Sequence, residues 1–159
     1  MDIALSIGNF DAVHLGHVAI VERARDAVGD GRVVIWSFNP SPTEFLHPTA
    51  AVERLTEFSR RRDLLLQAGA DEVMELIPTA AFMNQSPEAF VAYFSDALAP
   101  QFVVEGEGFR FGKNRKGTLE DLITLGSTFD FSAIKVQPLE VTLLDQTIHR
   151  ASSSLVRTL

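Results

Sequence analysis

Two histidines three residues apart, His14 and His17, lie near the start of the chain in the stretch GNFDAVHLGH. An apolar run at residues 3–7 precedes it, and apolar residues after Val18 recur at the spacing of a helix face. The pattern predicts a strand–loop–helix corner with both imidazoles on one side of the helix start. The first turn of a helix has free N–H groups and a partial positive charge, so the corner is a candidate phosphate site. Gly16 leaves room there for a ligand or backbone to come close.

Other readings of this corner are weaker. It lacks the G-x-x-x-x-G-K-[ST] pattern of a P-loop and the G-x-G-x-x-G pattern of a dinucleotide fold. A zinc site needs a third or fourth ligand, and the chain has no cysteine to supply one. We therefore expect no metal held by the protein alone. A helix that merely begins with two solvated histidines remains the alternative.

The elements that position these histidines alternate along the chain. Strands are predicted at 3–7, 32–38, 72–77, 101–105 and 133–136, with a short sixth at 141–144, and helices at 18–28, 56–67, 86–98 and 118–126. Alternation of this kind implies parallel pairing with right-handed crossovers. We expect an α/β fold: a Rossmann-like doubly wound, mostly parallel sheet of five to six strands with helices on both faces. The site should lie outside the carboxyl ends of the first and fourth strands.

Composition limits the class of protein. With 159 residues, 46% of them apolar, the chain is expected to form one domain with a sizeable core. The lack of cysteine fits a reducing cytoplasm. No apolar run approaches the roughly 20 residues of a membrane span, so we expect no membrane association. A net charge of −7 argues against nucleic acid as a partner, and an anionic substrate would need local cations.

The stretch GNFDAVHLGH resembles the G-x-F-D-G-x-H-x-G-H signature of the H-x-G-H nucleotidyltransferase superfamily. More narrowly, the chain resembles the FMN adenylyltransferase (FAD synthetase) domain of bacterial bifunctional riboflavin kinase/FAD synthetases. Three further stretches carry this resemblance: SFNPSP at 37–42, GEGFRFGKNRKG at 106–117, and SSSLVR at 152–157. It extends from Leu5 to Leu159. Residues 1–159 are then a single nucleotidyltransferase domain without a riboflavin kinase domain, and we expect no conversion of riboflavin to FMN.

The resemblance implies a reaction. AMP would pass from ATP to FMN to give FAD and pyrophosphate, with Mg2+ accompanying ATP; ATP and FMN are the expected partners. Two alternatives remain: a nucleotidyltransferase acting on another phosphorylated acceptor, or a nucleotide- or flavin-binding module without activity. The oligomeric state is not indicated by the sequence.

The resemblance also implies roles for particular residues. His14 and His17 would be catalytic, donating hydrogen bonds to the triphosphate. The nucleotide would be bound by residues of the first motif, the fourth strand and the C-terminal stretch: Gly8, Asn9, Phe10, Asp11, Gly16, Gly106, Arg150, Ser152, Ser153, Ser154 and Arg157. FMN would be bound by Ser41, Phe109, Arg110, Phe111 and Arg115. Serines at a helix start are commonly only caps, which is the alternative for residues 152–154.

Besides Ser154, which conservatively replaces a threonine, four positions depart from the family pattern. Ala12 replaces a glycine, and in the Phe-Glu-Pro-His-Pro stretch Asn39 replaces the acid and Ser41 the histidine. Gly108 replaces the Asp or Asn of V-G-x-[DN]-F-x-F-G-x-x-R-x-G, a side chain able to bond a ribose or flavin. Separately, the adjacent arginines at 60–62 would fan around a helix, so we interpret them as a solvated face.

Overall fold

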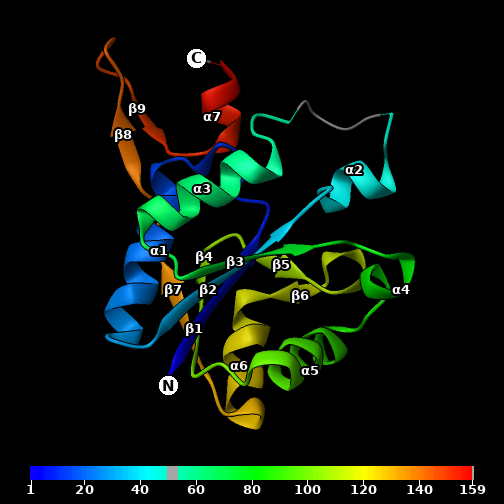
Figure 1. Ribbon diagram of the computed structural model, residues 1–159. Helices are drawn as coiled ribbons and strands as arrows, with labels where there is room; N and C mark the ends of the chain where they lie inside the picture. Colours follow the sequence, from blue (N-terminus) through cyan, green and yellow to red (C-terminus); the bar gives the residue numbers. More distant parts are fainter. Residues whose placement is uncertain (50–53, 159) are drawn as a thin grey trace.

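The centre of the molecule is a five-stranded sheet whose strands are all parallel. The structure is a computed structural model that describes residues 1–49 and 54–158, with Arg157 and Thr158 described by backbone alone (Figure 1). In spatial order the strands are β3 (Glu72–Leu76), β2 (Arg32–Phe38), β1 (Ile3–Gly8), β4 (Phe102–Gly106) and β7 (Ser132–Val136). The chain order reverses between β1 and β4, which confirms the expected doubly wound fold.

Helices cover both faces of the sheet, as expected (Figure 1). On one face α1 (Leu15–Val28) and α3 (Phe58–Ala68) pack against alternate strand residues such as Val33 and Ile35. On the other face α5 (Pro87–Leu98) and α6 (Leu119–Phe129) pack against the intervening ones, such as Val34 and Trp36. A parallel sheet buried on both faces explains the nearly continuous apolar runs of the strands.

The remaining elements are short and lie around the carboxyl ends of the strands or between the helices. They are η1 (Asp11–Val13), α2 (Pro42–Leu46), α4 (Ala80–Met83), β5 (Arg110–Phe111), η2 (Lys113–Arg115), β6 (Gly117–Thr118), β8 (Glu140–Thr142), β9 (Ile148–Arg150) and α7 (Ser153–Thr158). The expected sixth strand at 141–144 is wrong as a member of the central sheet. Instead, β8 pairs antiparallel with β9 in a separate hairpin. Within the described residues, no helix combines the length and apolar character needed to cross a membrane.

Three helix boundaries differ by more than one residue from the expected ones, and the first is the start of α1, which begins at Leu15 and not at Val18. Thr56 does not cap α3; the N-cap is Glu57, and the Thr56 hydroxyl bonds Asp11 instead. Helix α6, which was expected to end at Gly126, continues to Phe129. In the last two of these cases a tertiary contact outweighs the local signal. The Thr56 hydroxyl is bonded to Asp11, and Gly126 packs directly against the backbone of Phe131.

β1 and β4 separate before their carboxyl ends. They pair only at Ala4 with Phe102 and at Leu5 with Val103. Further along, the Ile7 N–H donates to Oε1 of Glu105 at 2.7 Å, so a side-chain oxygen takes the place of a ladder carbonyl. Glu105 is 3% exposed, and burial raises its pKa well above the usual range. A buried carboxyl group, whose protonated form is favoured by burial, therefore lies at the point where the two strands part.

Candidate active site

The two histidines sit where β1 leads through η1 into α1, as the sequence predicted. His14 is the N-cap of α1, and its Nδ1 accepts the N–H groups of Gly16 at 3.0 Å and His17 at 3.3 Å. The amides expected to be free for phosphate are thus occupied by an imidazole of the protein itself. Since Nδ1 accepts, a neutral His14 carries its proton on Nε2 and can donate from that atom.

The rings of His14 and His17 stack, with centroids 3.6 Å apart and planes 21° apart. Burial, together with repulsion from a protonated His14, lowers the pKa of His17 to about 3. Burial also lowers the pKa of His14. Both rings are therefore neutral at pH 7 and can donate hydrogen bonds without carrying charge. Nδ1 of His17 is buried and has no hydrogen-bond partner within the described part of the chain.

Gly16 is required for this stacking. A Cβ at this position would lie 2.9 Å from Cε1 of His14 and 3.3 Å from the carbonyl oxygen of Ala151. The expected close approach is confirmed, and what approaches is the ring of His14 and the backbone that leads into α7. Any side chain at residue 16 would displace the His14 ring.

The loop before the histidines has an unusual backbone. Phe10, Ala12 and Val13 all have positive φ, at 53°, 69° and 47°. Such values are costly for residues other than glycine, most of all for β-branched valine. The glycine that the family has at residue 12 is explained by this conformation, which Ala12 adopts under strain. Strain of this kind is typical of functional sites.

A pocket of about 180 Å³ opens beside the two histidines. Its walls come from the start of α1, the end of β4, the chain after β7, and β9, and include His14, Gly16, His17, Gly106, Gly108, Val136, Leu139 and Arg150. Arg150 forms an ion pair with Glu107 at 3.6 Å across the rim. The structure thus brings Gly16, Gly106 and Arg150, three of the predicted nucleotide-binding residues, to the histidines.

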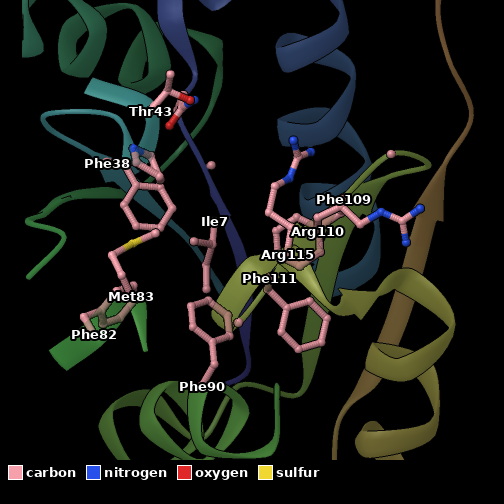
Figure 2. Close-up of a pocket in the computed structure, with 15 residues that line it drawn as sticks. Ile7, Phe38, Thr43, Phe82, Met83, Phe90, Phe109, Arg110, Phe111 and Arg115 are labelled. Carbon is pink, nitrogen blue, oxygen red and sulfur yellow. The ribbon is translucent and has the colours of Figure 1, made fainter. Parts of the chain in front are cut away.

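A larger pocket of about 330 Å³ lies against the first and is mainly apolar (Figure 2). Phe38 and Phe82 lie on one side of it and Phe109 and Phe111 on the other (Figure 2). Four of the five predicted FMN-binding residues line it, Phe109, Arg110, Phe111 and Arg115, together with Gly8 and Asn9. Sequence reasoning missed Phe38, Pro42, Thr43, Phe82, Met83 and Phe90, which come from elements far apart in the chain.

Gly108 lines both of these pockets. A Cβ added there would meet nothing within 4 Å, and its φ lies outside the left-handed region. The position where the family has Asp or Asn therefore faces open space between the two pockets. A polar side chain at residue 108 could reach a ligand in either one.

A third, polar pocket of about 200 Å³ is lined by Asn9, Asp11, Ser41, Glu44, Arg54, Arg61 and Ser153. Ser41, predicted to bind FMN, lies here and not in the apolar pocket. Its hydroxyl accepts the Glu44 N–H at 3.1 Å, and the Glu44 carboxylate accepts the Ser41 N–H, which is a capping box at the start of α2. No helix was predicted at this position, and Pro42 at the first helical position of α2 is compatible with the helix start.

The C-terminal serines make contacts within the protein. Ser153 donates to the carbonyl oxygen of Asp11 at 2.9 Å, and Ser152 accepts the Leu155 N–H at 3.0 Å as a cap. Ser154 is exposed. The side chain of Arg157 lies outside the described part of the structure. The contact between Ser153 and Asp11 brings the C-terminal stretch against the histidine loop.

The interpretation of residues 60–62 as a solvated face is wrong for Arg61. Arg60 and Arg62 are exposed, but Arg61 is 3% exposed and donates to Ser37 Oγ at 3.0 Å and to the carbonyl oxygen of Phe38 at 2.8 Å. Its place four residues before the buried Leu65 puts it on the apolar face of α3. That spacing was the signal available in the sequence.

The order of the parallel strands and the pockets at the reversal between β1 and β4 define a Rossmann-like, doubly wound α/β fold. Pantothenate synthetase from Thermus thermophilus shares it, with a TM-score of 0.65 over 100% of this chain and 62% of that one at 20% identity. A macrolide-efflux protein from Streptococcus pneumoniae has a TM-score of 0.83 at 27% identity, over 99% of this chain and 50% of that one.

The sequence model of the FAD synthetase family matches residues 1–151, and the chain belongs to this family. The bifunctional riboflavin kinase/FMN adenylyltransferase of Pseudomonas fluorescens is 33% identical over 155 residues, which are 96% of this chain and 48% of that protein. The protein of the same name from Escherichia coli K12 is 30% identical over 139 residues, 84% of this chain and 44% of that one. The chain thus spans less than half the length of these curated relatives.

Proposed function

We propose that the chain transfers AMP from ATP to FMN, giving FAD and pyrophosphate. One observation carries this proposal: an apolar, aromatic pocket lies directly against the pocket that holds His14 and His17, and Gly108 lines both. A flat apolar ring and a phosphorylated nucleotide can then meet at their shared wall. Membership of the FAD synthetase family supports the same reaction.

The pockets suggest a place for each substrate. The isoalloxazine ring of FMN fits the larger pocket, between the phenylalanines, with Arg110 and Arg115 available for its phosphate. The adenosine of ATP fits the smaller pocket beside Gly106 and Arg150. The triphosphate would then pass the two histidines toward the start of α7, with Ser152, Ser153, Ser154 and Arg157 around its β- and γ-phosphates.

In the reaction, a phosphate oxygen of FMN forms a bond to the α-phosphorus of ATP. The bond from that phosphorus to the oxygen bridging to the β-phosphorus breaks, and its electron pair leaves with pyrophosphate. A phosphate dianion is already nucleophilic, so no side chain needs to be activated. Catalysis then consists of positioning two anions and stabilising the charge that moves to the leaving group. Neutral His14 and His17 supply N–H donors for that charge.

Mg2+ is proposed to arrive as part of the MgATP substrate. In the described residues, no group of three His, Asp or Glu side chains is arranged to hold a metal ion. The metal ion in nucleotide sites is commonly held by phosphates and water, which fits this role for Mg2+. We assign no residue and no step to it.

Net charge and the lack of cysteine also support the proposal. A net charge of −7 supports capture of small anions by local cations such as Arg110, Arg115 and Arg150, and it gives no support to a nucleic-acid partner. The lack of cysteine supports a reducing compartment such as the cytoplasm.

The direct test is to incubate the chain with MgATP and one acceptor at a time: FMN, riboflavin, or nicotinamide mononucleotide. We expect pyrophosphate and FAD with FMN, and neither product with riboflavin, which lacks the attacking phosphate. Pyrophosphate release with nicotinamide mononucleotide but not FMN would assign another acceptor. Binding of both substrates without turnover would assign a binding module.

The role of His17 has its own test. If its N–H stabilises charge chiefly in the transition state, His17→Ala should lower kcat by on the order of 10²–10³ with a much smaller effect on ATP affinity. His47→Ala is the matched control, because His47 is exposed and lines none of the three pockets. A loss confined to ATP binding, or an unchanged kcat, would contradict the role.

A further inference from the structure

We propose that Asp11 is a positioning residue that holds the histidine loop, residues 9–14, in its strained conformation, and that its carboxylate does not contact the nucleotide. The inference rests on the proposed function, because the groups it positions are the histidines that act on ATP. It replaces the nucleotide-binding role that the motif alone suggests for this residue.

The carboxylate of Asp11 is bound by the segment that precedes α3. Oδ1 accepts the N–H of Thr56 at 2.9 Å and its hydroxyl at 2.8 Å, while Oδ2 accepts the N–H of Leu55 at 2.9 Å. Asp11 is only 9% exposed. Burial raises its pKa, but these hydrogen bonds and the charge of Arg61 outweigh burial, so the pKa lies below the usual value. The ionised carboxylate is therefore held by protein donors.

Thr56 links the Asp11 carboxylate directly to the strained backbone. Its hydroxyl donates to Asp11 and accepts the Ala12 N–H at 3.1 Å. In addition, the hydroxyl of Ser153 in α7 donates to the Asp11 carbonyl oxygen at 2.9 Å. The two residues after Asp11, Ala12 and Val13, have positive φ, and a conformation of that kind persists only when surrounding contacts fix it.

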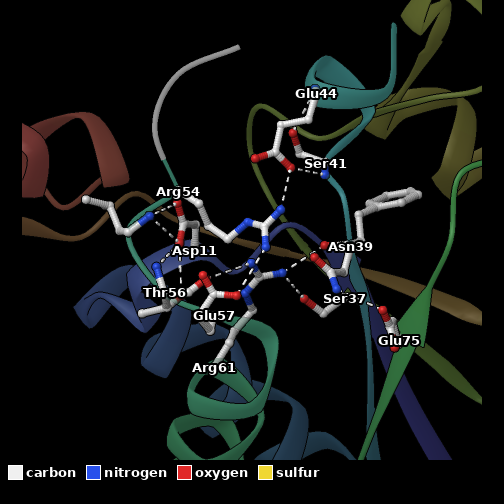
Figure 3. A network of polar contacts seen from close by, with 12 residues as sticks. Asp11, Ser37, Asn39, Ser41, Glu44, Arg54, Thr56, Glu57, Arg61 and Glu75 are labelled. Carbon is white, nitrogen blue, oxygen red and sulfur yellow. Dashed lines mark hydrogen bonds and ion pairs between the residues drawn. The ribbon is translucent and has the colours of Figure 1, made fainter. Parts of the chain in front are cut away.

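Arg61 connects the same segment to the central sheet (Figure 3). It donates to the carbonyl oxygen of Thr56 at 3.4 Å and to Ser37 Oγ at the end of β2. Ser37 in turn donates to the carbonyl oxygen of Asn9 at 2.9 Å. The histidine loop is thus tied at Asn9, Asp11 and Ala12 to a buried scaffold. His14 follows two residues later, so release of these ties would shift both imidazoles.

Two variants test the inference, Asp11→Asn and Thr56→Val, with Thr56→Ser as the matched control. Asn places an NH2 group where one carboxylate oxygen faces N–H donors, and Val removes the hydroxyl while keeping the shape of Thr. We expect each to lower kcat at least tenfold, to leave the FMN Kd within twofold, and to speed backbone hydrogen exchange at residues 10–17 but not in β2. Thr56→Ser should retain wild-type kcat and exchange.

Three results would overturn the inference. One is a wild-type kcat per folded molecule in both variants, with only Tm lowered. Another is a raised KM for ATP at unchanged kcat in Asp11→Asn, which would make Asp11 a nucleotide ligand. The third is unchanged exchange at residues 10–17. Exchange is measured without substrate, so it tests the inference even if the wild-type chain makes no FAD. If Asp11→Asn does not fold, the same criteria apply to Thr56→Val.

Discussion

At the scale of single residues, Ala12 shows how a departure from the family pattern is accommodated. Its φ of 69° is one that glycine adopts freely and alanine only at a cost. We expect Ala12→Gly to raise the free energy of unfolding by about 0.5–1 kcal/mol, because the relief of strain exceeds the added entropy of the unfolded chain. Urea unfolding measures this.

The control for Ala12 is Ala89→Gly. Ala89 is exposed within α5, and glycine there should lower the free energy of unfolding by about 0.5–1 kcal/mol. If both variants destabilise the chain, residue 12 is not under strain.

Gly108, unlike Ala12, is a position where the backbone would accept a side chain without strain, and it faces open space between two pockets. An amide side chain there could add one or two hydrogen bonds to a ligand and would reduce the freedom of the loop. We expect Gly108→Asn to tighten binding of ATP or FMN by roughly tenfold, about 1.4 kcal/mol, with little change in kcat. Calorimetry with each ligand is the measurement.

A second glycine of the same loop provides the comparison for residue 108. Gly112 has a φ of 76°, and a Cβ there would lie 3.0 Å from the backbone nitrogen of Pro87. Gly112→Asn should therefore lower stability without improving affinity. If Gly108→Asn also fails to tighten either ligand while its fold stays intact, residue 108 does not face the substrate.

At the scale of elements, the buried Glu105 occupies the point where β1 and β4 separate, and its carboxyl group accepts the Ile7 N–H. Its pKa is raised, so the folded state favours the protonated acid. The stability that protonated Glu105 contributes is fully present below the usual carboxyl pKa of 4.5. It is lost as pH rises toward the raised pKa that Glu105 has in the folded state. We expect Glu105→Gln, which keeps an oxygen for the Ile7 N–H, to become more stable relative to wild type as pH rises from 5 to 8.

Urea unfolding of both proteins at the two pH values isolates this contribution, because all other groups are shared. Glu105→Val is the control for the hydrogen bond: it leaves the buried Ile7 N–H without its acceptor and should cost about 1–3 kcal/mol at either pH. An identical pH dependence of wild type and Glu105→Gln would show that Glu105 is ionised in the folded state.

Individual elements differed in how well their sequence predicted them. Strand β2 was predicted at its observed bounds, and the Ser86–Pro87 start of α5 was confirmed, because the apolar run and the capping pattern are local signals. The partner of β8 was not predictable in the same way. A short strand carries no local mark of whether it joins the sheet or forms a hairpin, and the hairpin follows from pairing with β9.

At the scale of the whole molecule, alternation of strands and helices was enough to predict the parallel sheet and the place of the site. The spacing of His14 and His17 predicted their common side, and the family pattern predicted most of the loop residues at the apolar pocket. The hydrogen bonds from Leu55 and Thr56 to Asp11 join residues 44 to 45 apart, and Phe38 contacts Phe82, 44 residues further along, on one side of the apolar pocket. Contacts between distant segments arise only from the fold, so no local sequence pattern predicts them.

The wall that the two pockets share has a consequence for how the reaction ends. When FMN and AMP bind separately, each molecule loses translational entropy. FAD contains both halves in one molecule, so this entropy is lost only once when FAD binds. FAD should therefore be held more tightly than FMN, with a Kd at least tenfold lower by calorimetry. It should also compete with both substrates in initial-rate measurements, and a Kd equal to that of FMN would show that the two halves do not bind together. If FAD is bound at both ends in this way, we expect its release to limit turnover in the proposed reaction, and removal of free FAD by an acceptor should raise the rate of synthesis.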